Sequence, residues 1–263
     1  MNLKFSANIG FLWEHLPLTE RIIAAGRAGF DAVECHFPYD VPANETRAAL
    51  EATNLPMIGI NTSLGPENSK LFGVAALPDY EELAHQYIDQ AIEYAAAIGA
   101  KNINVVAGVT DGRDKHEQMY RKNLKYACER AQELEIGILI EPLNPRSVPG
   151  SHLSQIEQAI STIEALNIKN LKLMFDVFHT QIVQGDLVML LSEHIKHIGH
   201  VQISAVHDRG EPDVGEVNFP YVLNALENLG YQGYVGAEYK PRGDSVEQGL
   251  SHGWKIFVAL NAH

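Results

Sequence analysis

Short apolar runs alternate along the chain with longer segments in which apolar residues recur every three to four positions. Such runs are typical of buried strands, and such periodic segments are typical of amphipathic helices. Several of the runs end abruptly in a polar side chain, as GILIEPLN does at Glu141, which a proline follows at once. Eight strands are predicted, at residues 5–10, 32–37, 57–63, 102–108, 137–144, 171–179, 197–204 and 234–240.

Helical periodicity follows each of these strands, with glycine commonly at the helix end. The helices are expected at about residues 20–28, 43–53, 79–98, 114–134, 154–166, 186–194, 220–229 and 245–260. Eight strands alternating with eight helices, without a linker or a break in composition, predict one (β/α)₈ TIM barrel over residues 1–263 instead of an open doubly wound sheet. The phosphate-binding patterns GxGxxG and GxxxxGKS are absent, which disfavours a nucleotide-binding fold.

Four consecutive predicted strands carry an oxygen-donor side chain near their carboxyl ends. These residues are Glu141, Asp176, Gln202 and Glu238. Active sites of such barrels lie at this end, so the four side chains should form an arc at one mouth. One such acid alone is commonly a helix cap or a salt-bridge partner, but four on neighbouring strands favour a site. Three carboxylates and one amide oxygen suit Mg²⁺ or Mn²⁺, and without a cation the carboxylates would repel one another.

Three further side chains are candidates for binding a substrate. Lys240 follows Glu238 by two residues, so it either points into the same mouth and holds a substrate carboxylate or lies on the surface past the strand. His179 could orient or protonate a substrate, ligate a second metal, or be a core histidine with a backbone partner. Asn61 stands near the end of the third strand.

The connection from Leu64 to Pro78 is longer than the two to six residues common in such loops. It is rich in Gly and Pro, and it is interpreted either as a lid or binding loop or as a plain surface excursion.

Charge and composition narrow the function classes. The formal net charge is −13, and the acids are scattered, which argues against nucleic acid as a partner because phosphate binding relies on clustered Lys and Arg. The two cysteines, Cys35 and Cys128, form no metal-binding pattern and are expected to be buried and reduced. No signal peptide and no long apolar run are evident, so a cytoplasmic protein with no membrane partner is expected.

Sequence motifs along nearly the whole chain resemble the hydroxypyruvate isomerase family, within the xylose isomerase-like TIM barrels. The two most specific blocks are RGEPDVGEVNFPY and GYQGYVGAEYKPRG. The others are FSAN, AGFDAVE, FPYD, NTS, ALP, IEPLN, FDVFH and GHVQI.

The resemblance implies a divalent-metal enzyme that interconverts hydroxypyruvate and tartronate semialdehyde, or a relative acting on 2-oxo-tetronates, so that the partner is a small hydroxy-oxo acid. It implies Glu141 and Glu238 as the acid/base pair, and Glu141, Asp176, Gln202 and Glu238 as the ligands of Mg²⁺ or Mn²⁺. Related ketose 3-epimerases usually have histidine at the Gln202 position, so glutamine favours the isomerase branch.

The expected chemistry agrees with these residues. Moving a carbonyl to the adjacent carbon requires removal of a proton, stabilisation of an enediolate and return of a proton. A divalent cation stabilises the enediolate charge as a Lewis acid, and two glutamates can transfer the protons, so no organic cofactor is required.

Three other functions are weighed against this one. A ketose 3-epimerase is the nearest, whereas an endonuclease or phosphodiesterase would need several histidine ligands and a basic face. A catalytically silent barrel that binds a metabolite is the third. Both a monomer and a homo-oligomer remain open.

Overall fold

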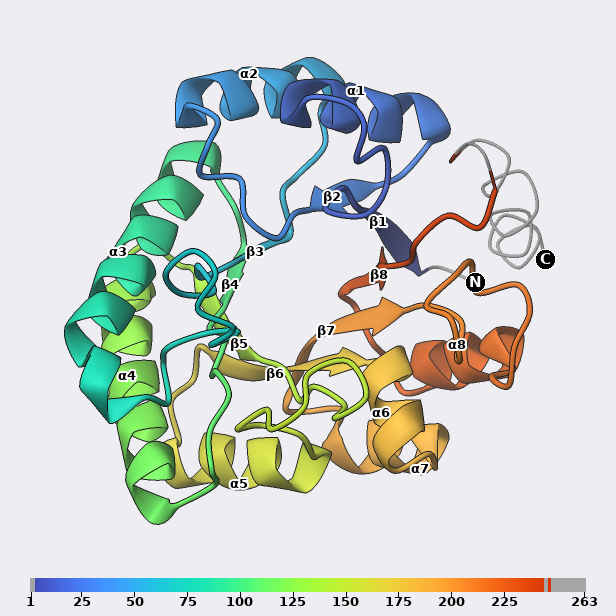
Figure 1. The fold of residues 1–263 in the computed structure, drawn as a ribbon. Helices are drawn as coiled ribbons and strands as arrows, with labels where there is room; N and C mark the ends of the chain where they lie inside the picture. Colours follow the sequence, from blue (N-terminus) through green and yellow to red (C-terminus); the bar gives the residue numbers. More distant parts are fainter. Residues whose placement is uncertain (1–2, 244–245, 247–263) are drawn as a thin grey trace.

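Eight parallel strands form a ring in the computed structural model, which describes residues 3–243 and Val246 (Figure 1). The strands are β1 (Lys4–Asn8), β2 (Ala32–Glu34), β3 (Gly59–Asn61), β4 (Asn102–Asn104), β5 (Gly137–Ile140), β6 (Leu171–Asp176), β7 (Ile198–Ile203) and β8 (Tyr234–Ala237). Their order is β2-β1-β8-β7-β6-β5-β4-β3. A parallel bridge between Val33 and Met57, with a hydrogen bond from Ile58 N to Val33 O, joins β2 to β3 and closes the ring.

Helices surround the ring on its outside. They are α1 (Leu18–Ala28), α2 (Ala43–Thr53), the 3₁₀ turn η1 (Pro78–Tyr80), α3 (Glu81–Ile98), α4 (Asp114–Gln132), α5 (Ile156–Leu166), α6 (Val177–Val183), α7 (Leu187–His194) and α8 (Phe219–Asn228). The prediction of a (β/α)₈ barrel is confirmed. The last helix predicted, at about residues 245–260, lies outside the described residues apart from Val246.

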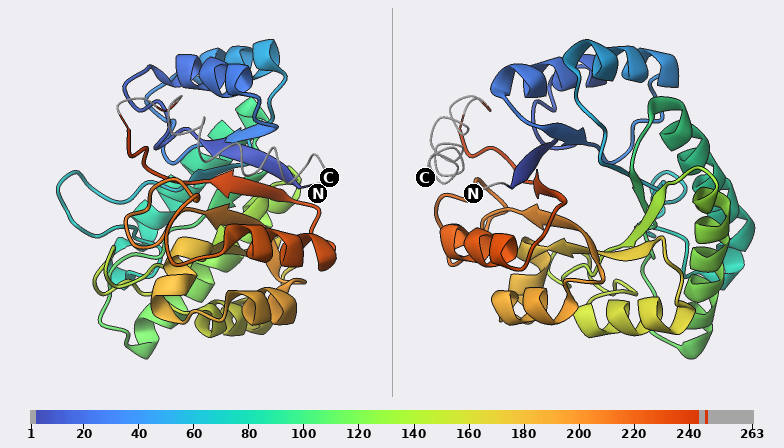
Figure 2. Two further views of the ribbon diagram at one scale, coloured as in Figure 1. Left: turned by 90° about the vertical axis from the view of Figure 1, so that its right-hand side faces the viewer. Right: turned by 180° about the vertical axis from the view of Figure 1, so that it is seen from behind.

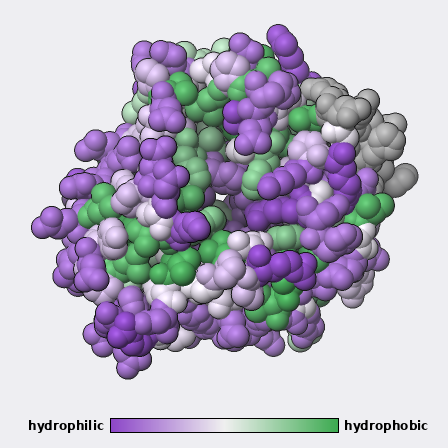
Figure 3. All heavy atoms as spheres, in the orientation of Figure 1, coloured by the Kyte–Doolittle hydropathy of each residue, from purple (hydrophilic) through white to green (hydrophobic). Residues whose placement is uncertain are grey.

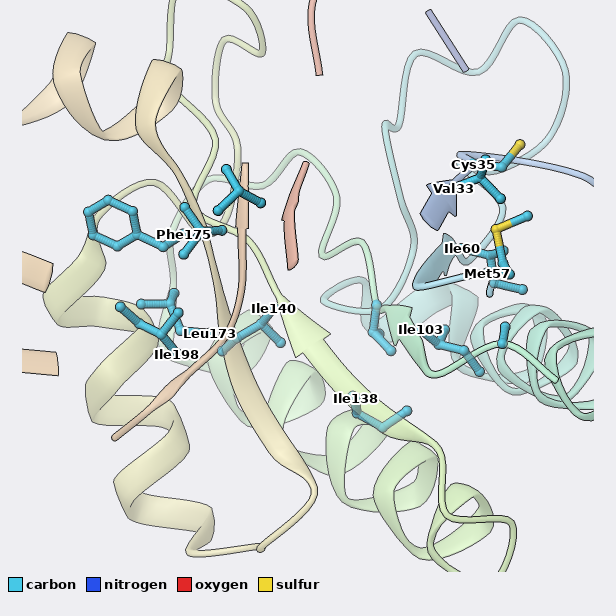
Figure 4. Close-up of a cluster of buried hydrophobic side chains, with 14 of the residues drawn as sticks. Val33, Cys35, Met57, Ile60, Ile103, Ile138, Ile140, Leu173, Phe175 and Ile198 are labelled. Carbon is cyan, nitrogen blue, oxygen red and sulfur yellow. The ribbon is translucent and has the colours of Figure 1, made fainter. Parts of the chain in front are cut away.

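Side-chain alternation along the strands separates two environments. One set of positions is apolar and packs beneath the helices, and Figure 4 shows part of this cluster, including Ile60, Ile138 and Phe175. The alternate positions include buried polar residues, namely Ser6, Asn8, Glu34, Asn104, Asp176, His200 and Gln202. Burying that many polar groups is costly unless they are hydrogen-bonded, so these side chains need partners inside the barrel.

The strand ends meet at one mouth. In the left view of Figure 2 the strand arrowheads and the long connection between β3 and α3 lie at the same end of the barrel. Polar residues at the carboxyl ends of the strands are therefore brought together with that connection.

The sixth strand is shorter than the predicted run 171–179. It ends at Asp176, and α6 begins at Val177 because the carboxylate of Asp176 accepts a hydrogen bond of 2.8 Å from Phe178 N, capping the helix. His179 therefore lies in the first turn of a helix and not on the strand. The connection from β6 to β7 holds two helices, α6 and α7, where one was predicted.

Two other predictions concern cysteines and membranes. Cys35 and Cys128 are both buried and free, and burial raises the pKa of each thiol to about 12. Among the described residues, no helix combines the length and apolar composition needed to cross a bilayer.

Candidate active site

A cavity of about 270 Å³ lies at the carboxyl ends of the strands, and Figure 3 shows a hollow in the middle of this face. Apolar side chains, among them Phe37, Phe72 and Leu143, form much of its wall. The polar residues that line it are His36, Asn61, Asn104, Glu141, Ser147, His179, Arg209 and Glu238.

Glu141 directly follows β5, where Pro142 stops the strand. Asn104 Nδ2, from the end of β4, donates a hydrogen bond of 2.9 Å to Glu141 Oε2, and His179 Nε2 lies 3.8 Å from Oε1. Burial, reinforced by the nearby carboxylates of Glu238 and Asp176, raises the pKa of Glu141 well above its usual range. This carboxylate therefore belongs to a crowded group of acids.

Asp176 and His179 lie one turn apart at the start of α6. His179 Nε2 is 3.5 Å from Asp176 Oδ2, and Asn144 N donates a hydrogen bond of 2.9 Å to His179 Nδ1. Burial, assisted by Glu238 and opposed by Arg209, raises the pKa of Asp176 to about 7. Burial and the charge of Arg209 lower the pKa of His179 to about 3. His179 is thus an uncharged imidazole held in place by its partners.

Glu238 directly follows β8, which lies three strands from β5 in the sheet. Its Oε1 lies 3.0 Å from His36 Nε2 and 3.1 Å from Arg209 Nη2, while its Oε2 is buried without a hydrogen-bond partner among the described residues. Burial alone would raise the pKa of Glu238, but the charge of Arg209 and the contact with His36 lower it to about 2. The unpartnered oxygen is one atom available to a ligand.

Arg209 is a site residue that the sequence interpretation did not single out. Its Nη2 donates to Asp176 Oδ2 at 3.1 Å, and its Nη1 lies 3.1 Å from His179 Nε2. The guanidinium also packs over the rings of Phe11 and Phe178, 5.3 and 5.0 Å from their centroids. The surrounding carboxylates raise the pKa of Arg209 despite its burial. The signal for it was present in the block RGEPDVGEVNFPY, which begins with this arginine.

Gln202 lies on β7 beside Asp176, with which it is paired in the strand register. Its Nε2 donates a hydrogen bond of 3.1 Å to Glu34 Oε1, from the end of β2. Its Oε1 is buried and has no hydrogen-bond partner among the described residues. Glu34 and His36 were not predicted as site residues, although period-two alternation along AVECHF places them on one side of the strand.

The two remaining predicted substrate-binding residues lie farther out. Asn61 ends β3 and lines the cavity. Lys240 is exposed, is not among the cavity-lining residues, and places its Nζ 5.4 Å from the centroid of Phe11, which does line the cavity. Lys240 therefore lies at the edge of the mouth, where it packs against Phe11 of the cavity wall.

The long connection after β3 contributes Leu64 and Phe72 to the cavity wall. Gly73 N donates to Leu64 O at 2.6 Å within this segment. Val109 N donates to Leu71 O at 2.8 Å and so fastens the segment to the chain beyond β4. Gly73 also forms an antiparallel bridge with Ala107, and a side chain at position 73 would meet backbone atoms there. This connection is thus a wall of the site, and its action as a lid stays a prediction.

Glu141, Asp176 and His179 each offer one ligand atom, and these atoms all lie within 4.8 Å of one another. Such a group could hold a metal ion. Of the four predicted ligands, Glu141 and Glu238 line the cavity, whereas Asp176 and Gln202, which are paired in the strand register, are not among the lining residues. Arg209 lies between Asp176 and Glu238.

Comparison with known proteins defines the class. A model of the xylose isomerase-like TIM barrel matches residues 22–255, so the chain belongs to the xylose isomerase-like TIM barrel family.

Curated relatives narrow the class to isomerases. A 2-oxo-tetronate isomerase from Haemophilus influenzae is 37% identical over 246 residues, covering 92% of this chain and 95% of that protein. Hydroxypyruvate isomerase from Escherichia coli K12 is 36% identical over 251 residues, covering 94% and 97%. The prediction of an enzyme of the isomerase class is confirmed.

Among solved structures, a protein from Brucella melitensis described as AP endonuclease, family 2, superposes with a TM-score of 0.92. It is 35% identical, and the match covers 97% of this chain and 98% of that one.

Proposed function

We propose that the protein is a divalent-metal-dependent isomerase that interconverts hydroxypyruvate and tartronate semialdehyde. The observation that carries this is the convergence of three carboxylates, Glu141, Asp176 and Glu238, at the carboxyl ends of β5, β6 and β8, where Glu141 and Glu238 line the cavity and Arg209 bridges Asp176 to Glu238. Relatives named hydroxypyruvate isomerase and 2-oxo-tetronate isomerase support the substrate class, a small hydroxy-oxo acid.

The residues fit a divalent cation. Gln202 Oε1 and Glu238 Oε2 are buried oxygens that no described protein group satisfies, and leaving such atoms unpaired in a protein interior is costly. The pKa of Glu141 is raised partly because other carboxylates crowd it, a repulsion that a cation would remove. We assign Glu141, Asp176, Gln202 and Glu238 as the ligands, and their oxygen atoms favour Mg²⁺ or Mn²⁺. Such a cation supplies Lewis-acid stabilisation of the negative charge that develops on the substrate oxygens.

Proton transfer falls to Glu141 and Glu238. They approach the cavity from strands three positions apart in the sheet, and both line it. One glutamate removes a proton from the hydroxyl-bearing carbon next to the substrate carbonyl, and the other gives a proton to the former carbonyl carbon. The hydroxyl proton passes from its oxygen to the former carbonyl oxygen, so that the carbonyl and the hydroxyl exchange places. His36 and Arg209 fix the orientation of Glu238, as Asn104 fixes that of Glu141.

Two positively charged side chains and the apolar cavity wall complete the proposed substrate site. Arg209 is the one Lys or Arg side chain among the cavity-lining residues that the structure describes, and Lys240 stands at the edge. We propose that the positively charged side chains of Arg209 and Lys240 bind the substrate carboxylate. Phe37, Phe72 and Leu143 give one side of the cavity an apolar surface, which disfavours water beside the reacting carbons.

A 2-oxo-tetronate is the second candidate substrate. Three curated relatives that are 37%, 39% and 37% identical to the chain carry the name 2-oxo-tetronate isomerase. Both substrates share the carboxylate and the adjacent carbonyl and hydroxyl, so the same residues serve either reaction.

A substrate panel tests the proposal. Purified protein is assayed with hydroxypyruvate, a 2-oxo-tetronate and a ketose, each with Mg²⁺, with Mn²⁺ and after removal of metal, and products are identified by NMR. We expect turnover of a hydroxy-oxo acid that depends on the cation. Turnover of the ketose alone would assign the protein to the epimerases, and binding without turnover of any of the three would contradict an isomerase.

A further inference from the structure

Gly236 on β8 leaves a gap in the barrel interior that the side chain of Glu34 fills. The register places Asp176 beside Gln202, Gln202 beside Gly236, and Gly236 beside Ser6, so these four residues form one row across four strands. A Cβ atom at Gly236 would lie 2.4 Å from Glu34 Oε1, which is too close for any real contact. The absence of a side chain at position 236 is therefore what admits the carboxylate.

Four donors surround this carboxylate, which is buried at 3% exposure. Ser6 Oγ and Asn8 Nδ2 each donate at 3.3 Å, His200 Nε2 contacts Oε2, and Gln202 Nε2 donates at 3.1 Å. Ser6 and Gln202 are the two neighbours of Gly236 in the row. The carboxylate thus bridges the gap from one side to the other.

The bond to Gln202 decides which end of that amide is free. A carboxylate oxygen accepts hydrogen bonds, so it selects the NH₂ end of Gln202 and leaves Oε1 as the outer atom. Oε1 is the buried oxygen without a partner among the described residues. We propose that Glu34 is a positioning residue, which holds Gln202 so that its amide oxygen is presented to a divalent cation.

A second chain of contacts leads from Glu34 to Glu238. Asn8 Nδ2 donates to Glu34 Oε1 and lies 3.2 Å from His36 Nε2. His36 Nε2 in turn lies 3.0 Å from Glu238 Oε1. Glu34 therefore supports a second carboxylate of the same site, although it does not line the cavity itself.

The inference rests on the proposed function, since it assigns Gln202 and Glu238 to a cation site. In Glu34→Gln the new NH₂ group can donate to Gln202, which turns the amide oxygen of Gln202 away from the site. Residues that orient metal ligands typically contribute about 10- to 100-fold to metal affinity. We expect Glu34→Gln to weaken Mn²⁺ binding by about that factor.

Mn²⁺ titration followed by electron paramagnetic resonance, which detects the free ion, measures the affinity without turnover. Gly236→Ala provides an independent route, because its methyl group would displace the Glu34 carboxylate without altering Glu34. Gly59→Ala is the matched control, since a Cβ on this strand glycine meets only a backbone oxygen at 3.9 Å. We expect weaker Mn²⁺ binding in Gly236→Ala and unchanged binding in Gly59→Ala.

The direction in which Glu34→Gln changes Mn²⁺ affinity in two different backgrounds separates a positioning role from a merely structural one. In Gln202→Glu the new carboxylate at position 202 faces the carboxylate of Glu34, and the two repel each other. Adding Glu34→Gln places an NH₂ donor at position 34 opposite this carboxylate. Glu34→Gln should therefore weaken Mn²⁺ binding in the wild-type background and strengthen it in the Gln202→Glu background. The same direction of change in both backgrounds would overturn the inference.

The remaining outcomes are also decisive. If Glu34→Gln does not fold, Gly236→Ala decides, and wild-type affinity in the folded Gly236→Ala variant would overturn the role of Glu34. If the wild type is an active isomerase that binds Mn²⁺, but Glu34→Gln and Gly236→Ala bind Mn²⁺ with unchanged affinity, only this inference is overturned. A wild-type protein that binds no Mn²⁺ would overturn the proposed metal dependence, and the inference with it.

Discussion

Arg209 Nη2 lies 3.1 Å from Oε1 of Glu238, and the same nitrogen donates to Asp176 at 3.1 Å. One guanidinium nitrogen thus bridges two of the carboxylates assigned to the cation. It supplies positive charge at the place where three acids converge, which lowers the electrostatic cost of holding them together.

Arg209→Met should therefore destabilise the metal-free protein, because it leaves buried carboxylates without their charge partner. Removing one member of a buried ion pair typically costs about 3–5 kcal/mol. In Mn²⁺-saturated protein the loss should be smaller, since the cation supplies positive charge. Urea unfolding with and without Mn²⁺ measures both values, and Arg47→Met, in an exposed pair with Glu51, is the control. Equal losses in the two conditions would argue against charge compensation by Arg209.

Exhaustive chelation should abolish activity and leave the fold largely intact, because the apolar core between strands and helices does not depend on the site. Circular dichroism should be unchanged, and added Mn²⁺ or Mg²⁺ should restore turnover. Full activity in protein shown by elemental analysis to be metal-free would refute the metal dependence.

Lys240→Met should raise the Michaelis constant for an acidic substrate more than it lowers kcat, because Lys240 is assigned to a carboxylate that does not react. Steady-state kinetics provide both constants. Lys4→Met is the matched control, since Lys4 also packs over an aromatic ring, that of Tyr234, but starts β1 at the amino end of the barrel. An unchanged Michaelis constant in Lys240→Met would place Lys240 outside substrate binding.

Glu117 on α4 should make stability depend on pH. The contact with His152 is the main cause that lowers its pKa to about 2, and Arg121 and Thr162 act in the same direction against burial. Because the folded pKa is below the ordinary value of 4.5, the stabilisation is present above about pH 4.5 and is lost as the pH falls toward 2.

Glu117→Gln should therefore lower the free energy of unfolding at pH 7 by about 1–2 kcal/mol, allowing for partial exposure, and the difference from the wild type should vanish near pH 2. Urea unfolding between pH 2 and pH 7 measures this. Glu51→Gln, in an exposed helical pair, should change stability by less than about 0.5 kcal/mol. A constant difference across the pH range would show that the carboxylate of Glu117 is not the cause.

The barrel could be predicted because strand burial and helix periodicity are local in the sequence. GILIEPLN shows this well, since four residues from Gly137 to Ile140 form β5 and Glu141 follows at the mouth. The run LKLMFDVFH was wrongly predicted to be one strand over residues 171–179, because Val177 and Phe178 are as apolar as the strand before them. The capping carboxylate of Asp176, and not the apolar pattern, determines where the helix begins.

The supporting residues of the site were harder to predict. Arg209 lies in a loop beyond β7, with a positive φ of 58°, and only the folded chain brings it to Asp176 and Glu238. The carboxylate of Glu34 occupies the space left by a glycine on another strand, Gly236, which lies 202 positions later in the sequence. Such pairings depend on strand register across the closed barrel, and no local spacing encodes them.

Glu238→Gln tests the proton chemistry assigned to the site. The amide keeps the shape of the side chain and one ligating oxygen, but it cannot accept a proton at neutral pH. Loss of a general base typically lowers the rate by about 10² to 10⁴. Saturating metal removes any effect of weakened cation binding from the comparison.

The most direct measurement is solvent-deuterium incorporation into a carbon-bound position of hydroxypyruvate or its product, followed by NMR in D₂O at saturating Mn²⁺. The wild-type protein should incorporate deuterium as it turns over, and Glu238→Gln should do so at least about 100-fold more slowly. Turnover without any deuterium in the wild type, or more than about a tenth of wild-type exchange in Glu238→Gln, would contradict the assignment of Glu238 as a base.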